Sequence, residues 1–118
     1  MINKRGVGSD YETLAMEYLE GEKYQILERN FHSRWGEIDI IARDGDYLVF
    51  VEVKYRKNSS CGNPLEAVDA RKQKRICRTA VYYLSKNGYG DSKPCRFDVI
   101  AFEGEEVLHI KNAFEFAG

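Results

Sequence analysis

The segment from Tyr47 to Tyr55 constrains the fold more than any other part of this sequence. It consists mostly of β-branched and aromatic residues, a composition typical of a buried strand. Glu52 interrupts this apolar run, and an unpaired carboxylate in apolar surroundings costs on the order of several kcal/mol. The fold must therefore supply Glu52 with a partner.

A β-hairpin is predicted to join this segment to the one before it. Residues 37–43 alternate charged and apolar side chains, as a half-buried strand does, and Asp44-Gly45 is a strong signal for a two-residue turn. If these two residues form the turn, Asp39 lies opposite Phe50 across the hairpin. The turn thus decides which side chains of the two strands are neighbours.

The predicted register brings two carboxylates together. Side chains two residues apart on a strand share a face, so Glu52 and Lys54 point to the same side as Asp39. Asp39 and Glu52 become diagonal neighbours, about 7–8 Å apart at the backbone. Two carboxylates at this separation can hold one divalent cation, and we expect Mg²⁺ (or Mn²⁺) because hard ions prefer oxygen ligands. In the alternative interpretation, Glu52 and Lys54 form an ion pair where the strand emerges into water.

These residue types suit the hydrolysis of a phosphodiester bond. The reaction needs a metal ion that polarises the phosphate and lowers the pKa of a water molecule. It also needs a cation near the attacking water or the phosphorus oxygens, and Lys54 could supply it. We therefore expect Asp39 and Glu52 as metal ligands and Lys54 as a catalytic group.

Two further polar residues have two interpretations each. Glu12, in the first predicted helix, either points into the same site or closes a capping box with Ser9, which would stabilise the helix by about 1 kcal/mol. Gln73 lies on the apolar stripe of the second predicted helix, where its amide needs hydrogen-bond partners. A polar group of the site, a phosphate or a backbone carbonyl would serve Gln73 equally well. Asp98, inside an apolar strand, is interpreted as structural.

Basic residues are concentrated in one part of the chain. Eight of them lie between Lys54 and Arg78, against only Glu66 and Asp69, although the whole chain has a net charge of −1. This segregation predicts a face that binds a polyanion such as nucleic acid, while a merely solvated face is the alternative. The residues expected to contact phosphates are Lys57, Arg71, Lys72, Lys74, Arg75 and Arg78.

Hydrophobic periodicity predicts two helices and five strands. The first helix opens at Ser9 and ends at Gly21, and the second is capped by Asp69 and runs to about Lys86, with Gly88 as its stop. The first apolar stripe consists of Tyr11, Leu14, Ala15, Tyr18 and Leu19, and the second of Ile76, Cys77, Ala80, Tyr83 and Leu84. Strands are expected at residues 24–31, 37–43, 47–55, 96–102 and 107–110.

The order helix, three strands, helix, two strands predicts an α/β fold with a mixed five-stranded sheet flanked by helices. The chain of 118 residues has the size of one domain, so residues 1–118 are expected to form a single unit. No apolar run approaches the roughly 18 residues of a membrane helix, and no apolar stretch follows the basic N-terminus as in a secretory signal. The expected location is the cytoplasm, with no membrane association.

The three cysteines, Cys61, Cys77 and Cys95, are predicted to be free thiols, because they are odd in number and no secretory signal precedes them. Neither His32 nor His109 lies near a cysteine at the spacing of zinc ligands. A zinc site is therefore not expected.

Several of these segments together resemble the YraN family of uncharacterised bacterial proteins. That family is similar to the Holliday-junction-resolvase branch of the PD-(D/E)XK nucleases. The resemblance covers nearly the whole chain, and it implies a restriction-endonuclease-like α/β sandwich with a metal-dependent nuclease site. The matching motifs are Glu28-Arg29-Asn30-Phe31, Gly36-Glu37-Ile38-Asp39-Ile40-Ile41-Ala42, Leu48-Val49-Phe50-Val51-Glu52-Val53-Lys54, Glu66-Ala67-Val68-Asp69, Lys72-Gln73, Arg96-Phe97-Asp98-Val99 and Asn112-Ala113-Phe114.

The resemblance also implies a role for each candidate residue. Asp39 corresponds to the aspartate of the nuclease pattern, and Glu52 and Lys54 correspond to its Glu-x-Lys. Glu12 corresponds to the first-helix carboxylate of resolvase-like members, and Gln73 resembles the second-helix glutamine of some nuclease branches. The implied substrate is nucleic acid, DNA rather than RNA, and resolvase-like proteins commonly work as homodimers.

Two other functions fit the same sequence. A nucleic-acid-binding module with a vestigial site would keep the basic face and lose the metal. A protein-interaction domain would instead use the basic helix to dock an acidic partner. Binding of Mg²⁺ or Mn²⁺ would distinguish the nuclease from the vestigial module, and copurified nucleic acid would argue against the protein partner.

Overall fold

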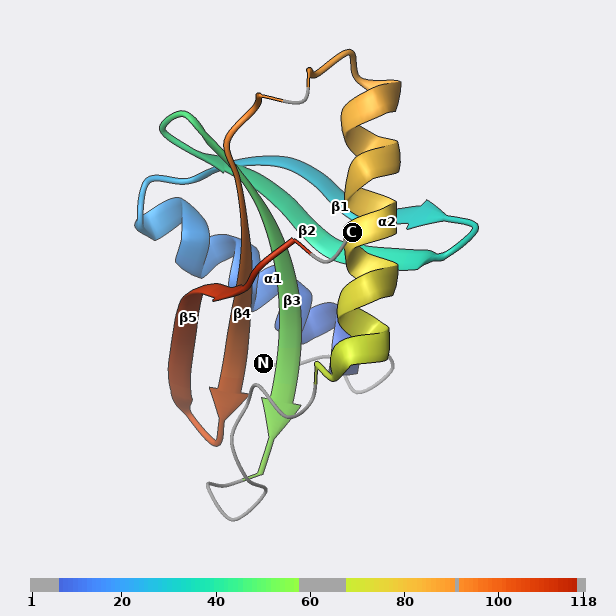
Figure 1. The fold of residues 1–118 in the computed structure, drawn as a ribbon. Helices are drawn as coiled ribbons and strands as arrows, with labels where there is room; N and C mark the ends of the chain where they lie inside the picture. The colour runs from blue at the N-terminus through green and yellow to red at the C-terminus, as the bar shows by residue number, and fades with distance from the viewer. Residues whose placement is uncertain (1–6, 58–67, 91, 117–118) are drawn as a thin grey trace.

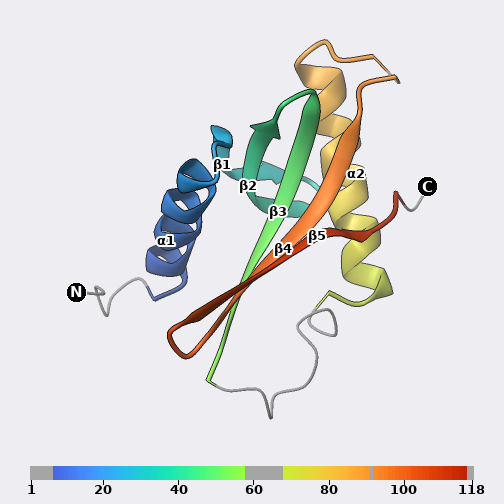
Figure 2. The same cartoon turned by 90° about the vertical axis from the view of Figure 1, so that its left-hand side faces the viewer.

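A mixed five-stranded sheet forms the centre of the structure (Figure 1). The computed structural model describes residues 7–57, 68–90 and 92–116, with side chains from Asp10 onward. Helix α1 covers one face of the sheet and α2 the other (Figure 2). The elements are α1 (Val7–Gly21), β1 (Gln25–Ser33), β2 (Gly36–Asp44), β3 (Tyr47–Arg56), α2 (Ala70–Lys86), β4 (Cys95–Glu103) and β5 (Glu106–Phe114).

The strands lie in the sheet in their order along the chain, β1-β2-β3-β4-β5. Among the described strands, only β3 and β4 run parallel, and α2 is the crossover that connects them. The predicted α/β fold, the mixed five-stranded sheet and the predicted order of the elements are therefore confirmed. The parallel pair is central, so β3 is covered by helices on both faces.

The turn between β2 and β3 lies one residue further along the chain than predicted. Asp44 pairs with Tyr47, so the two turn residues are Gly45 and Asp46 rather than Asp44 and Gly45. Gly45 has a φ of 60°, the positive φ that the first turn position takes in a type II′ hairpin. This arrangement places the glycine alone at positive φ and leaves Asp44 in the strand.

The changed turn alters the neighbours of the candidate ligands. Ile41, and not Asp39, lies opposite Phe50, so the predicted pairing was wrong. The pairing of β2 with β3 ends at Ile40 and Val51. Asp39 and Glu52 are the next residues on their strands.

Helix α2 agrees closely with the prediction. The Asp69 side chain caps it by accepting a hydrogen bond of 2.9 Å from the backbone nitrogen of Lys72, and the helix ends at Lys86. Of the predicted stripe, Leu84 is only partly buried, and the fully buried members are Ile76, Cys77, Ala80 and Tyr83. Thr79 was not predicted to be buried; its hydroxyl lies 2.7 Å from the Ser33 hydroxyl, which satisfies both groups.

Helix α1 differs from the prediction at two points. It begins at Val7, so a start at Ser9 was wrong, and the Ser9 side chain lies outside the described part of the chain. Leu14 was predicted to be buried but is 36% exposed, because α1 packs on the sheet through the narrow stripe of Ala15 and Leu19. The predicted end of the helix at Gly21 is confirmed.

As predicted, neither Cys77 nor Cys95 forms a disulfide bond within the described residues, and Cys61 lies outside them. Within the described chain, neither helix is long and apolar enough to cross a membrane.

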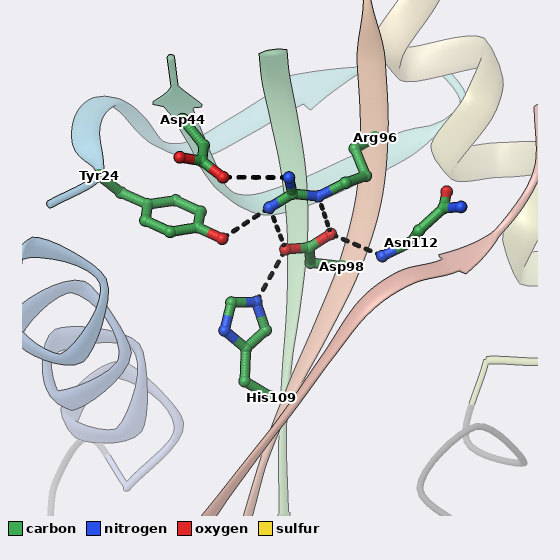
Figure 3. Close-up of polar contacts among 6 residues, drawn as sticks. All are labelled: Tyr24, Asp44, Arg96, Asp98, His109 and Asn112. Carbon is green, nitrogen blue, oxygen red and sulfur yellow. Dashed lines mark hydrogen bonds and ion pairs between the residues drawn. The ribbon is translucent and has the colours of Figure 1, made fainter. Parts of the chain in front are cut away.

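A buried ion network ties β4 to β5 (Figure 3). Asp98 on β4 is fully buried, and Arg96 donates to both of its oxygens, from Nε at 2.9 Å and from Nη2 at 3.0 Å. His109 Nε2 lies 2.7 Å from Asp98 Oδ2, and the backbone nitrogen of Asn112 donates to Oδ1 at 3.0 Å. Although burial opposes ionisation, the bonds from His109, Arg96 and Asn112 hold the pKa of Asp98 below its usual value.

Arg96 extends the same network across the sheet (Figure 3). Its Nη1 donates to Asp44 Oδ2 at 3.1 Å, at the turn between β2 and β3. Its Nη2 donates to the Tyr24 hydroxyl at 2.6 Å, at the start of β1, and burial raises the pKa of Tyr24 to about 12. One arginine therefore links β4 to the β2–β3 hairpin and to the segment that enters β1.

Replacing Asp98 by asparagine is expected to destabilise the protein by about 3 kcal/mol, because Arg96 would lose the buried carboxylate that accepts two of its bonds and would keep only the partly exposed Asp44 as a counter-charge. Urea unfolding at pH 7 measures the difference. In the wild type, the folded pKa of Asp98 lies below its unfolded value. Its contribution to stability is therefore present above the unfolded pKa and is lost as the pH falls through the folded pKa.

The matched control is Asp46→Asn in the exposed turn, which should change stability by less than about 0.5 kcal/mol. Equal stabilities for Asp98→Asn and this control would show that the network contributes little.

Candidate active site

The regular pairing of the sheet is interrupted at Asp39. Ile38 packs in the core on the α2 side and Ile40 in the core on the α1 side, although residues two apart on a regular strand share a face. On the neighbouring strand, Asn30 has a φ of 54° between two regular pairs. Asp39 Oδ2 accepts a hydrogen bond of 2.8 Å from the backbone nitrogen of Val53. The Asp39 side chain thus accepts the hydrogen bond of a β3 amide just beyond the last backbone pair of β2 and β3.

Asp39, Glu52 and Lys54 line one cleft of about 580 Å³ below the N-terminus of α2. The structure therefore brings together the three residues that the sequence singled out as the catalytic core. The other residues that line the cleft are Trp35, Gly36, Glu37, Val53, Asp69, Arg71, Lys72, Arg75 and Ile76.

Glu52 is the most buried charged group of the cleft, with 4% of its surface exposed. Its Oε2 lies 3.4 Å from Lys72 Nζ, so its nearest cationic partner comes from α2. Burial and the neighbouring charge of Asp39 raise the pKa of Glu52 to about 7. Burial also raises the pKa of Asp39, although the bond from Val53 opposes this shift. The two carboxylates are thus only partly compensated by the protein.

Two lysines with opposite pKa shifts face these carboxylates. Burial, together with the hydrogen bond and positive charge of Lys72, lowers the pKa of Lys54. Burial acts against protonation of Lys72 too, but the hydrogen bond to Lys54 and the charges of Glu52 and Asp39 raise its pKa overall. Lys72 therefore holds its proton firmly, whereas Lys54 releases its proton more readily than an ordinary lysine.

The donor set of the cleft fits a hard divalent cation. Asp39 uses Oδ2 for Val53, and Glu52 uses Oε2 for Lys72, so each carboxylate has a second oxygen without a hydrogen bond among the described residues. Within those residues, no cluster of three or more His, Cys, Asp and Glu side chains is arranged around a common point. Mg²⁺ is commonly held by one or two carboxylates, with waters and substrate phosphates as its remaining ligands.

Glu12 approaches Asp39 from α1, but it is not among the residues that line the cleft. Its Oε1 lies 3.7 Å from Arg29 Nε, and its side chain bonds to Asn30. Burial and the charge of Asp39 raise the pKa of Glu12, so the two carboxylates interact electrostatically. Because α1 begins at Val7, Ser9 lies inside the helix, so the predicted capping box that opens the helix at Ser9 was wrong.

Gln73 does not reach the cleft in the structure. Its Nε2 donates a hydrogen bond of 2.9 Å to the backbone oxygen of Val68, ahead of α2. Of the interpretations given for this amide, the structure shows the contact with a backbone carbonyl.

The six basic residues predicted to contact phosphates lie in three places. Three of the six predicted phosphate contacts, Arg71, Lys72 and Arg75, line the cleft at the first turns of α2, where the helix dipole also favours an anion. Arg78 lies one turn further along, beside a second groove. Lys57 and Lys74 are exposed and are not among the cleft residues of the described chain.

The role of Lys72 as the partner of Glu52 was not predicted, because the sequence pattern indicates Lys72 only as a phosphate contact. A signal was present: the cap at Asp69 puts Lys72 in the first turn of α2, close to where a crossover helix enters over the sheet. The distance between β3 and that turn is a tertiary property, however, and no local pattern encodes it.

A family model described as "Uncharacterised protein family UPF0102" matches residues 11–102. A UPF0102 protein of Lachnoclostridium phytofermentans is 53% identical over 117 residues, which cover 99% of each chain. A UPF0102 protein of Geotalea uraniireducens is 46% identical over 98% of this chain and 94% of its own length. One of Pseudomonas putida is 42% identical over 92% of this chain and 91% of its own length.

Glu52→Gln is expected to stabilise the metal-free protein at pH 8 by on the order of 2 kcal/mol. Because the pKa of Glu52 is raised in the folded protein, ionisation of Glu52 destabilises the folded state. Below the unfolded pKa, Glu52 is protonated in both states and this loss of stability is absent. The loss grows as the pH rises from the unfolded pKa towards about 7 and is complete at pH 8. Glutamine cannot ionise, so the advantage of the variant should shrink towards pH 5. Urea unfolding in EDTA at both pH values measures it.

The exposed Glu17→Gln is the control and should follow the wild type at both pH values. Parallel stability profiles for Glu52→Gln and the wild type would contradict the raised pKa.

Proposed function

The chain belongs to the UPF0102 family, the YraN family that its sequence resembles, and we propose that it is a divalent-metal-dependent hydrolase of nucleic-acid phosphodiester bonds. The observation that carries this proposal is the burial of Glu52 beside Asp39, at the base of a cleft with arginines at its rim. Burying two incompletely compensated carboxylates destabilises a fold. A bound cation would relieve this repulsion.

Each residue of the cleft has a role in this proposal. Asp39 and Glu52 would hold the ion through the oxygens that the protein leaves without hydrogen bonds. When bound, the ion would polarise the phosphate and supply a more acidic water molecule. Lys54, with its lowered pKa, would orient the attacking water or stabilise the developing charge on the phosphate.

The rim of the cleft would hold the nucleic-acid backbone. Arg71 and Arg75 would contact phosphates next to the scissile bond, and Lys72 would partly offset the charge of Glu52 while also facing the substrate. Glu12 would act from the α1 side by adding negative charge near Asp39. We further propose DNA as the substrate and a homodimer as the working form.

We expect the protein to cleave at least one member of a panel of duplex, single-stranded, flapped and four-way-junction DNAs and RNAs in Mg²⁺ or Mn²⁺. Lys54→Ala and Glu52→Gln should each reduce the rate by about 100-fold or more, since each removes a group that acts on the reacting phosphate. Initial rates on labelled substrates measure the effect. Equal cleavage rates in the wild type and both variants would identify a contaminating nuclease and contradict the proposal.

Calorimetric titration with Mn²⁺ separates an active site from a vestigial one. The wild type should bind the ion, and Asp39→Ala should not. Identical heats for the two proteins would favour a nucleic-acid-binding module without a metal.

Arg75→Ala is expected to weaken binding of a DNA duplex and to reduce the slope of log K against log salt by about 1, as the loss of one phosphate contact predicts. Fluorescence anisotropy at several salt concentrations, in EDTA, measures both quantities. Lys111→Ala, an exposed lysine on β5, is the matched control and should leave the slope unchanged. A salt-independent affinity of the wild type would argue against nucleic acid as the partner.

A further inference from the structure

A second, apolar groove of about 490 Å³ adjoins the carboxylate cleft. Trp35 lines both cavities, so they meet at this side chain. The residues that line the groove include Arg78, Val81, Tyr82 and Phe116. Tyr82 is 40% exposed and Phe116 is 46% exposed, which is unusual for aromatic side chains that lie together.

A line of cations connects the two cavities along α2. Arg71, Arg75, Arg78 and Tyr82 follow the spacing i, i+4, i+7, i+11, which places them on one stripe of the helix. Arg71 and Arg75 line the carboxylate cleft, and Arg78 and Tyr82 line the apolar groove. A chain with regularly spaced phosphates could therefore run from one cavity to the other.

The tip of the β1–β2 hairpin brings a second aromatic ring to this stripe. The hairpin extends past α2 (Figure 1), and a Cβ atom on Gly36 would lie 3.8 Å from the Arg75 Cβ atom. The ring centroids of Trp35 and Tyr82 are 6.3 Å apart, with an interplanar angle of 61°. The Cζ atom of Arg34 lies 5.2 Å from the centroid of the Trp35 ring. Two aromatic rings and flanking guanidinium groups thus share one surface.

We propose that this groove binds an unpaired nucleotide of the substrate, with its base against Trp35 and Tyr82 and its phosphates on Arg75 and Arg78. The inference rests on the proposed function, and it specifies the substrate as a nucleic acid with a single-stranded segment beside the scissile bond. Bases inside a duplex are already stacked on each other, so only an unpaired base can offer its face to these rings. An acidic protein segment would match the arginines, but it would not explain why the groove continues into the carboxylate cleft.

Tryptophan fluorescence tests this proposal directly, because Trp35 is the only tryptophan of the chain. The protein is titrated in EDTA at fixed salt with a ten-residue oligothymidine, a blunt duplex, and the same duplex with a single-stranded overhang. The single strand and the overhang should quench the emission, and the blunt duplex should not. Tyr82→Leu should weaken binding of the overhang duplex about tenfold, and Tyr82→Phe should preserve it.

Each contrary result has a distinct meaning. Equal quenching by the blunt and overhang duplexes, or unchanged affinity in Tyr82→Leu, would overturn the inference. Quenching by oligoglutamate but by none of the nucleic acids would overturn it in favour of an acidic protein partner. Cleavage of the blunt duplex without any quenching would leave the proposed function intact and reject only the inference. Quenching by single strands without cleavage of any substrate would reject the proposed function and support the groove alone.

Discussion

Two carboxylates are buried in the central parallel strands of the sheet, and the electrostatic cost of burying them organises the groups around them. Asp98 on β4 receives two bonds from Arg96, one from an Asn112 amide and a contact from His109, and its pKa is lowered. Among the described residues, Glu52 on β3 has one ion pair, with Lys72, and its pKa is raised to about 7. The buried charge is thus fully compensated at Asp98 on β4 and only partly compensated at Glu52 on β3.

The degree of compensation decides which of the two carboxylates could still accept a ligand. A fully compensated ion is enclosed by its partners and has no capacity for a ligand, whereas a partly compensated one gains from any cation that reaches it. Helix α2 provides that access. Its cap at Asp69 fixes the first turn above β3, so a lysine from this turn meets Glu52 while two arginines remain at the rim.

The local features of the fold could be predicted from the sequence, because short-range chemistry determines them. The strands, the cap at Asp69 and the stop near Gly88 follow from periodicity and capping patterns. The convergence of Asp39 with Glu52 was also predicted, although through a wrong turn register. That error had little effect on the site because moving the turn by one residue changes the register by two, so Asp39 and Glu52 still share a face.

What could not be predicted depends on distances between elements. The pairing of Lys72 with Glu52, the four partners of Arg96 and Asp98, and the exposure of Leu14 all arise from how helices settle on the sheet. Gln73 illustrates the same limit, because its amide could be satisfied either by the site or by the nearby Val68 carbonyl. Only the packed chain distinguishes the two.

The bond between Asp39 and the Val53 amide couples the candidate ligand to the main chain of β3. Any change in the electron density of that carboxylate, whether from protonation or from coordination, alters the strength of the bond it accepts. The NMR signal of the Val53 amide, on the middle strand of the sheet, therefore reports on the state of Asp39. The nitrogen and proton resonances of this amide should shift when the carboxylate changes state, even if no atom of the backbone moves.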